Sequence, residues 1–365
     1  MAENWADLPP ELLELCSRRL LLEDWFAFRP VCSTWRAAAF EERLDIPWWM
    51  LEDDESTETE WAEFYSPFSL RIHRVLLPEV KGKKKCFSSR GWILTIGKDL
   101  QIHMLNPLSR AASRYRDEIV KLPSLDKFPG WSTEGFEPDA PEMYQDFLCK
   151  FVLSASPAST PNYTVMVNLW SAGPLCFWKP GNEEWIELTS PPDDHVFDVI
   201  HYWGQFVVVN SKGDIFTCDV DGPHPTAAQL ILEMPPEIRD STYLKIGEYL
   251  VESVGRLLLI VRFGKEGHGT AGFQVFVVDL DTRKWTKLES MGNVSLFVGF
   301  NSSFSVQLDE NQQAIKPNCI YFTCFDDIGI YHMEDGRIEF DKEADYNVIP
   351  PLWIGSPPLW IEPRF

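Results

Sequence analysis

The sequence predicts a mainly β protein, in which a short N-terminal segment of three helices precedes a β-propeller of four-stranded blades. Three observations support this fold class. Residues 5–44 contain no glycine and have the pattern of short helices, whereas the remainder is rich in β-branched and aromatic runs separated by Gly, Pro, Asn and Asp. A four-strand pattern recurs in the second part of the chain. No helices are predicted between its copies, which favours a propeller.

The helical segment carries start and stop signals for three helices. The run Pro9-Pro10-Glu11 is typical of a helix start, because proline lacks an N–H that the first turn would leave unbonded and an acidic side chain suits the helix dipole. A second helix is predicted from Glu23 to before Pro30, and a third follows Cys32-Ser33-Thr34. Three helices in about 40 residues cannot bury this much apolar surface among themselves, so their faces need a partner.

The motifs of this segment also resemble the F-box. Leu8-Pro9-Pro10-Glu11-Leu12-Leu13, the aliphatic helix end at Leu20 and Val31-Cys32-Ser33-Thr34-Trp35-Arg36 follow the F-box order over roughly residues 4–44. F-box segments dock on the Skp-type adaptor of cullin-RING ubiquitin ligases, so the resemblance implies that partner. The adaptor-binding residues carried over by position are Leu8, Pro9, Leu12, Leu20, Leu21, Val31, Cys32 and Trp35. Cys16 departs from the motif, since Ile or Leu is more usual there. The alternative is a helical cap packed on its own β domain.

Three parts are expected along the chain. Six acidic residues between positions 52 and 60 favour a solvated connector. We therefore predict an F-box over residues 1–45, an acidic connector over 46–65 and the propeller over 66–365.

The clearest copy of the four-strand pattern covers residues 243–288. Its third strand ends at the turn Asp281-Thr282-Arg283-Lys284, and the chain resumes with Trp285. Four weaker copies are centred on residues 102–106, 175–188, 215–232 and 329–332. The leftover strands at 70–77 and 352–361 are expected to combine into a sixth blade that closes the ring. Six blades are favoured, five or seven are possible, and a β-sandwich array is the alternative architecture.

Two stretches of the body resemble a known group. Residues 299–306 with 317–323, and Asp279-Leu280-Asp281-Thr282-Arg283-Lys284-Trp285, are similar to the KIB-type, kelch-like β-propeller that follows the F-box in a large set of plant proteins. With the F-box in front, the resemblance covers nearly the whole chain. It identifies architecture more than ligand.

The net charge argues against nucleic-acid and membrane partners, and the cysteine pattern indicates the cellular compartment. The net charge of −22, from 55 acidic against 33 basic residues, would repel polyphosphate and anionic lipid, so we expect neither nucleic-acid nor membrane binding. The sequence starts with neither the basic residues nor the apolar run of a signal peptide, and no apolar run is long enough to span a membrane. The eight cysteines include no Cys-x-x-Cys pair, which favours reduced thiols. A location in the cytoplasm, the nucleus or both is expected.

Patterns for catalysis or metal binding are weak. The run 264–272 is rich in glycine but leads from strand to strand, which favours a hairpin loop over a phosphate cradle, because the cradle needs a helix N-terminus. His195, Asp198 and His201 are spaced by three, and this spacing alternates faces on a strand. Paired acids such as Asp326-Asp327 are typical of turns. We expect no catalytic residue, no cofactor and no metal.

The chain contains 15 tryptophans, and we expect most of them to lie in the core. Large flat side chains fill gaps between blades, so we expect core positions for Trp170, Trp178, Trp185 and Trp285. Three others lie in a long insertion or among prolines and are candidates for a target-binding rim, namely Trp131, Trp353 and Trp360.

The two resemblances together imply the substrate-recognition subunit of an SCF-type cullin-RING E3 ubiquitin ligase. In that function the F-box holds the Skp-type adaptor, and through it a cullin, while the propeller loops hold a target protein. Such a subunit catalyses nothing and acts by proximity. Two alternatives stay open: a binding scaffold acting outside an active ligase, and a propeller enzyme with its site at the central channel. The target itself is not predicted.

Overall fold

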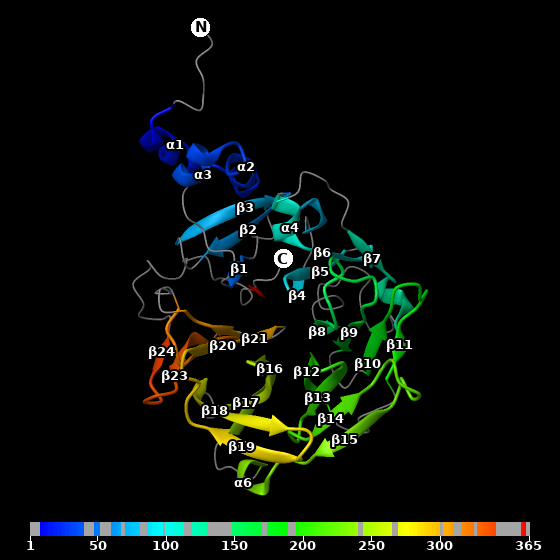
Figure 1. Cartoon of the computed structure of the whole chain (residues 1–365). Coiled ribbons are helices and arrows are strands. Elements are labelled where there is room, and N and C mark those ends of the chain that lie inside the picture. The colour runs from blue at the N-terminus through cyan, green and yellow to red at the C-terminus, as the bar shows by residue number, and fades with distance from the viewer. Residues whose placement is uncertain are drawn as a thin grey trace.

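Six β-sheets form a closed ring beside a small helical head (Figure 1). The structure is a computed structural model and describes residues 8–39, 47–51, 60–66, 70–80, 86–97, 99–112, 119–129, 148–169, 174–188, 195–239, 244–264, 269–299, 302–309, 315–324, 327–340 and 359–362. Within this part of the chain, none of the helices is long and apolar enough to cross a membrane.

The blades follow one another along the chain. Blade 1, from its innermost strand outward, contains β25 (Leu359–Ile361), β1 (Trp48–Met50), β2 (Trp61–Ser66) and β3 (Arg71–Leu76). Blade 2, in the same direction, contains β4 (Cys86–Ser89), β5 (Trp92–Ile96), β6 (Ile102–Leu105) and β7 (Val120–Leu122). Blade 3 contains β8 (Leu148–Leu153), β9 (Val165–Leu169), β10 (Leu175–Trp178) and β11 (Ile186–Glu187).

The second half of the ring has the same plan with one exception. Blade 4 contains β12 (Val196–Tyr202), β13 (Gln205–Asn210), β14 (Ile215–Cys218) and β15 (Ala228–Leu232). Blade 5 contains β16 (Leu244–Ser253), β17 (Arg256–Gly264), β18 (Thr270–Asp279) and β19 (Lys284–Leu288). Blade 6 contains β21 (Ser303–Gln307), β20 (Val294–Gly299), β22 (Cys319–Cys324), β23 (Asp327–His332) and β24 (Ile338–Phe340). It differs from the other sheets because β20 and β22 pair in parallel.

The ring closes through its two ends, which confirms the predicted sixth blade. Strand β25, near the C-terminus, pairs antiparallel with β1, near the start of the propeller, and brings Trp360 opposite Trp49. The backbone carbonyl of Trp360 also accepts hydrogen bonds from the Ser88 hydroxyl and, at 3.2 Å, from the Ser302 hydroxyl. Strand β25 is therefore bonded to blades 1, 2 and 6. Closure of this kind leaves only short, protected strand edges around the channel.

The expected connector over residues 46–65 is wrong in extent. Residues 48–50 and 61–66 are strands of blade 1, and Trp48, Phe64 and Tyr65 are almost fully buried. The connector was predicted from composition, and acidic residues dominate the composition of this window. The short apolar runs on both sides of the acidic residues were therefore not recognised as strands. Of the segment between these strands, residues 52–59 lie outside the described residues.

Tryptophans fill the gaps between blades as predicted. Trp185 stacks on Phe128 with ring centroids 4.4 Å apart, and its Nε1 donates to the Pro123 carbonyl of blade 2 at 3.1 Å. Trp285 of blade 5 makes the equivalent bond to the Glu233 carbonyl of blade 4 at 3.0 Å. The Trp that follows the third strand of a blade thus ties that blade to the preceding one. Trp178 and Trp185 are buried as predicted, Trp285 is half-buried, and Trp170 lies outside the described residues.

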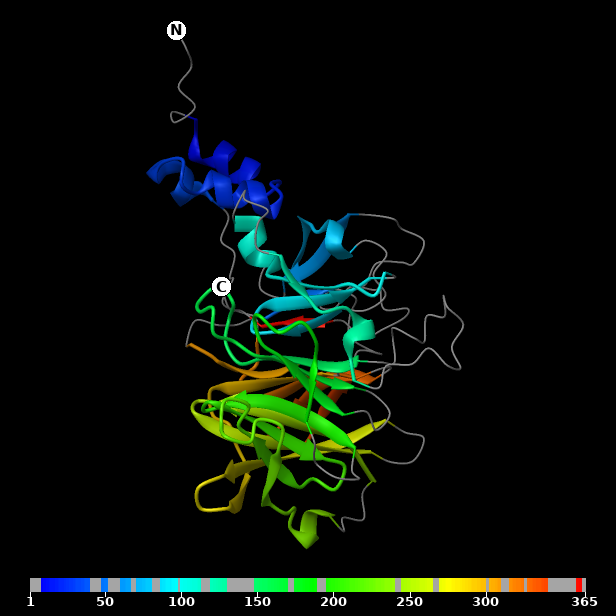
Figure 2. The same cartoon turned by 90° about the vertical axis from the view of Figure 1, so that its right-hand side faces the viewer.

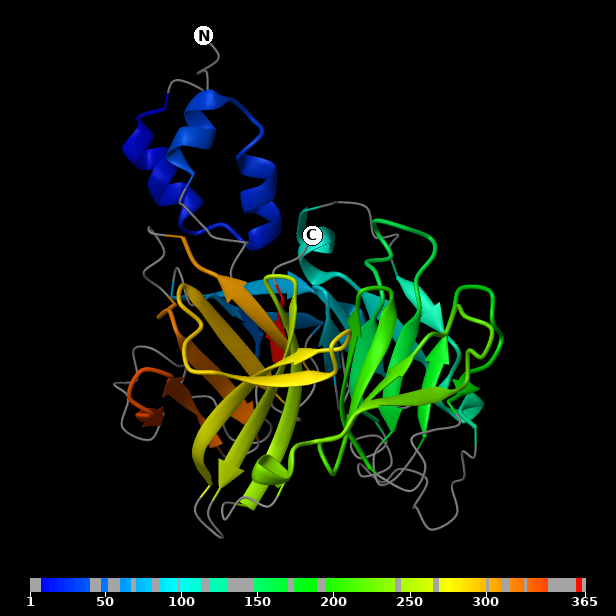
Figure 3. The ribbon, with the colours of Figure 1, turned by 60° about the horizontal axis from the view of Figure 1, so that its bottom comes forward.

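The head consists of three short helices, and Figures 2 and 3 show it beside the ring. The helices are α1 (Pro10–Ser17), α2 (Leu22–Phe28) and α3 (Ser33–Ala38), close to their predicted positions. Among the described residues, the other helical elements are α4 (Pro107–Ala112), α6 (Pro236–Arg239) and the 3₁₀ turns η2 (Pro78–Val80) and η3 (Leu125–Lys127). One side of α2 packs on α4 and β3. Leu22 and Trp25 on that side join the core cluster of blade 1.

Polar contacts fix the head in the same place. The Leu76 N–H donates to Glu23 Oε1 at 3.5 Å, and the Arg71 guanidinium donates to the Arg18 carbonyl. The head is therefore attached to the outer edge of blade 1 by one side only, and the remaining sides of its helices face away from the ring (Figure 2).

Candidate functional site

The head exposes an unusual share of apolar side chains. Leu12 and Leu15 are each 50% exposed, and they lie one turn apart on α1. Leu21, before α2, is 40% exposed and Val31, before α3, is 56% exposed. We call these four the apolar head residues. Large apolar side chains left in water on a small segment mark an interaction surface.

The head's own core explains why these four side chains point outward. Leu13, Phe28 and Ala38 are buried together, and Trp35 packs on Phe28 with ring centroids 4.4 Å apart. Cys32 begins α3, where its Sγ accepts from the Trp35 N–H at 3.5 Å. The inward positions alternate with the outward ones at helical spacing.

The eight predicted adaptor contacts divide into two groups. Pro9, Leu12, Leu21 and Val31 are exposed, whereas Leu8, Leu20, Cys32 and Trp35 are half-buried. Leu20 packs on both the head core and the blade 1 cluster. Sequence reasoning missed Leu15, although its spacing of three from Leu12 was a usable signal. Adaptor contact itself stays a prediction for the eight, and Leu15 is a further candidate because it is exposed.

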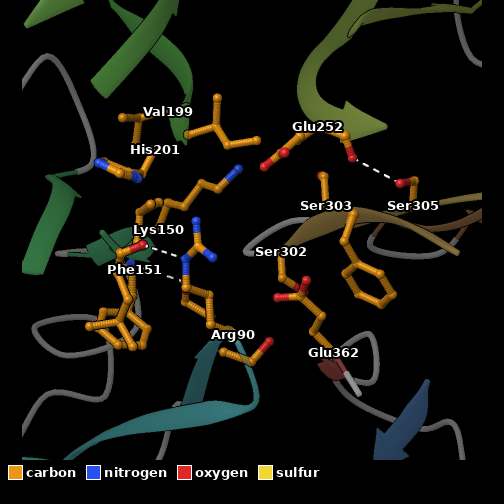
Figure 4. A pocket seen from close by; sticks show the side chains of 16 residues that line it. Arg90, Lys150, Phe151, Val199, His201, Glu252, Ser302, Ser303, Ser305 and Glu362 are labelled. Atoms are coloured by element: carbon orange, nitrogen blue, oxygen red, sulfur yellow. Dashed lines mark hydrogen bonds between the residues drawn. The ribbon is translucent and has the colours of Figure 1, made fainter. Parts of the chain in front are cut away.

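The second candidate is a small pocket at one mouth of the propeller channel (Figure 4). All six innermost strands or the residues next to them contribute to it. Its ionisable side chains are Arg90, Lys150, His201, Glu252 and Glu362. The cavity is about 80 Å³, well below the several hundred Å³ of a typical small-molecule site. The pocket is therefore a poor candidate for a substrate.

Two basic groups of the pocket are unavailable for chemistry, because Lys150 is committed to the fold and His201 is uncharged. The Lys150 ammonium bonds to Asp198, whose Oδ2 also accepts from the Leu250 N–H of blade 5 at 2.7 Å. Burial, reinforced by the Arg90 charge and opposed by Asp221, lowers the pKa of His201 to about 4, so its imidazole is neutral at neutral pH. Asp198 thus links three blades, and both of its carboxylate oxygens accept hydrogen bonds within the fold.

Blade 6 contains a Cys-His-Glu arrangement that resembles a catalytic triad. It was not predicted from the sequence. Cys319 Sγ lies 3.5 Å from His332 Nδ1, and His332 Nε2 lies 3.0 Å from Glu339 Oε1. These residues sit on neighbouring strands β22, β23 and β24, a juxtaposition that local sequence spacing does not reveal. The thiol is 1% exposed, and burial raises its pKa to about 11. A buried neutral thiol is a poor nucleophile, so the arrangement is structural. No cluster of three or more metal-ligating side chains occurs among the residues described.

Glu248 is a second buried ionisable group, and its position predicts a pH effect. Burial raises the pKa of its carboxyl from 4.5, while Lys245 Nζ, 3.1 Å away, opposes the shift. Because the folded state holds this proton more tightly than the unfolded state, the free energy of unfolding falls as the pH rises from 4.5 through the raised pKa.

Glu248→Gln keeps the shape but cannot ionise, so we expect it to remove this fall in stability. The measurement is urea denaturation of the full chain at several pH values between 4 and 8. Glu252→Gln on the same strand is the matched control, because its side chain is only half-buried. An unchanged pH slope in the Glu248 variant would refute the assignment.

The predicted target-binding rim is corrected at the one position that the structure describes. Trp360 is only 2% exposed and packs against Trp49 and Phe297, so it is a closure residue and presents no surface to a target. Trp131 and Trp353 lie outside the described residues. A different tryptophan, Trp203, is 79% exposed.

A three-helix head with exposed apolar side chains, joined to a ring of six blades, defines the F-box and propeller class of protein. The F-box domain family matches residues 5–46 and the KIB1-4 beta-propeller family matches residues 64–341. The chain belongs to the F-box proteins with a KIB1-4 beta-propeller, as the sequence resemblances predicted. This pairing is the architecture of an F-box substrate receptor, and F-box domains in general bind Skp1-type adaptors.

Relatives in Arabidopsis thaliana have the same extent. An F-box/kelch-repeat protein is 23% identical over 383 residues, covering 98% of this chain and 94% of its own length. The F-box protein SKIP23 is 22% identical over 404 residues, covering 97% of this chain and 96% of its own. A third F-box protein is 22% identical over 406 residues, with 96% and 95% covered.

Proposed function

We propose that this protein is the substrate-recognition subunit of an SCF-type cullin-RING E3 ubiquitin ligase. The head binds a Skp-type adaptor, which connects it to a cullin, and the propeller binds the target protein. The subunit raises the effective concentration of target lysines near the charged E2 and performs no chemistry itself.

The observation that carries the proposal is the set of apolar head residues on an F-box segment. Leu12, Leu15, Leu21 and Val31 are exposed although the rest of the head is anchored to blade 1. A partner that covers them removes apolar surface from water, which is worth about 25 cal/mol per Å². Six of the cysteines are free thiols, namely Cys16, Cys32, Cys86, Cys176, Cys218 and Cys319, which supports action in the cytoplasm or nucleus.

A reconstituted assay tests the complete function. The full chain is mixed with a plant Skp-type adaptor, cullin, RING protein, E1, E2 and ubiquitin, and ubiquitin chains on a bound target or on the chain itself are followed. We expect activity that is lost when residues 1–45 are deleted. Adaptor binding without any ubiquitin transfer would instead support the scaffold acting outside an active ligase.

A further inference from the structure

Two hairpin turns on one face of the propeller have an unexpected sequence. Trp203 and Gly204 join β12 to β13, and Val254 and Gly255 join β16 to β17. Their φ angles are 48°, 86°, 49° and 73° in that order, so both residues of each turn are left-handed. Turns of this type favour Asn-Gly or Asp-Gly, because Asn and Asp tolerate positive φ.

Neither Trp203 nor Val254 is buried, so hydrophobic burial does not offset the backbone strain of these turns. Trp203 is 79% exposed and Val254 is 61% exposed, more than any other large apolar side chain described. Arg90 makes an instructive comparison, since it occupies the same turn position in blade 2 with φ 51°. Its Nε donates to the Leu153 carbonyl at 2.9 Å, which gives that turn a structural reason that the other two lack.

A hydrogen bond holds the two turns together. The Tyr202 hydroxyl, at the end of β12, donates to the Gly255 carbonyl at 2.9 Å. Tyr202 and Trp203 also contact each other, with ring centroids 6.1 Å apart. Trp203 and Val254 therefore belong to one fixed surface across blades 4 and 5, which we call the turn pair. In Figures 1 and 2 these blades lie across the ring from the head.

Charge around the turn pair indicates the chemistry of its partner. Burial raises the pKa of Tyr202, and three carboxylates, Glu252, Asp281 and Asp279, raise it further. Hydrogen bonds from Thr282 keep the pKa of Asp279 low, with a smaller contribution from Lys284, so this carboxylate is ionised. Acidic groups thus dominate the field at Tyr202, in a chain of net charge −22. Such a surface complements Lys and Arg side chains.

We propose that the turn pair is the target-docking surface of the propeller, and that it binds a segment of the target in which an apolar side chain is flanked by lysines or arginines. This inference rests on the proposed function, because it assumes that the propeller holds a target. Exposed Trp beside a second apolar anchor is the composition of a binding hot spot, and the carboxylates select the basic flanks.

The variant that tests the surface is Trp203→Asn with Val254→Asn. Asn-Gly is the favoured sequence for these turns, so the double variant is expected to melt at the same temperature as the parent chain or higher, while its apolar anchors are gone. The matched control is Leu230→Ala with Leu244→Ala, which removes two exposed apolar side chains from the same two blades.

The probe is a displayed library of random peptides, selected on the full chain. We expect enriched sequences with an apolar residue between basic ones, and synthetic copies should bind the Asn variant about tenfold more weakly but the Leu control equally well. Equal binding to parent and Asn variant, enrichment of acidic sequences, or no enrichment would each overturn the proposal. So would self-association of the chain that the Asn variant abolishes, because the occupant would then be a second copy.

The result is independent of ligase assembly. Peptide binding is measured without cullin, E2 or ubiquitin, whereas the proposed function is judged by adaptor binding and ubiquitin transfer. Either can fail while the other stands.

Discussion

Leu12→Asp combined with Val31→Asp is expected to weaken binding of the Skp-type adaptor by about a hundredfold or more. Each residue is at least half exposed, so the charged variant should fold, yet a carboxylate buried at an apolar interface without a partner costs several kcal/mol. Isothermal calorimetry with purified adaptor and the full chain measures the effect, and circular dichroism verifies that the helices persist.

The control uses the same chemistry on the propeller. Leu230→Asp with Leu244→Asp also places two carboxylates at exposed apolar positions, 47% and 56% exposed, but on blades 4 and 5, which do not hold the head. This control should bind the adaptor like the parent chain. If both double variants bind equally well, the apolar head residues are not the adaptor surface. Trp35→Asp is less informative, because Trp35 packs on Phe28 and its loss would disturb the head itself.

Trp360→Ala is expected to lower the free energy of unfolding by about 3–5 kcal/mol, the usual range for a buried aromatic residue. Its indole lies 4.7 Å from Trp49 and 4.8 Å from Phe297, centroid to centroid, and these contacts join the C-terminal strand to blades 1 and 6. The cavity would form at the seam where the ring closes. Guanidinium denaturation of the full chain, followed by near-UV circular dichroism, reports the change.

Trp203→Ala is the matched control, because its side chain is 79% exposed and should change the free energy of unfolding by no more than about 1 kcal/mol. A loss below about 1 kcal/mol for Trp360→Ala would mean that closure does not depend on this residue. Ring opening should also make the variant more susceptible to proteolysis, since unpaired strand edges are then exposed.

Local patterns in the sequence were sufficient for much of this architecture. The helix signals at Pro9-Pro10-Glu11 and before Pro30 were confirmed within a few residues, because capping and proline effects act over one turn. The strand–turn–Trp pattern located two of the blades, since a Trp after the third strand fills the same gap in blades 3 and 5. Strands β1 and β2, on either side of the acidic run at 52–60, were not predicted. The prediction for this window followed its acidic composition and not its two short apolar runs.

Tertiary structure decided what the sequence left open. Trp360 changed from a candidate contact to a closure residue because its partner Trp49 lies 311 positions away, and no periodicity encodes such a pairing. Cys319, His332 and Glu339 meet only because three strands are neighbours in blade 6. The turn pair likewise depends on the bond from Tyr202 to Gly255, between two blades.

The sequence by itself therefore determined the class of protein: an F-box segment followed by a ring of β blades, acidic overall, with apolar residues in the head that follow a linear motif. Short-range chemistry carries that information, since caps, turns and apolar spacing act between near neighbours. Only the folded ring decided which side chains are buried where the ring closes, as Trp360 is. It also decided which large apolar side chains, such as Trp203 and Val254, stay exposed. Burial depends on long-range strand pairing, and residues distant in the chain determine it jointly.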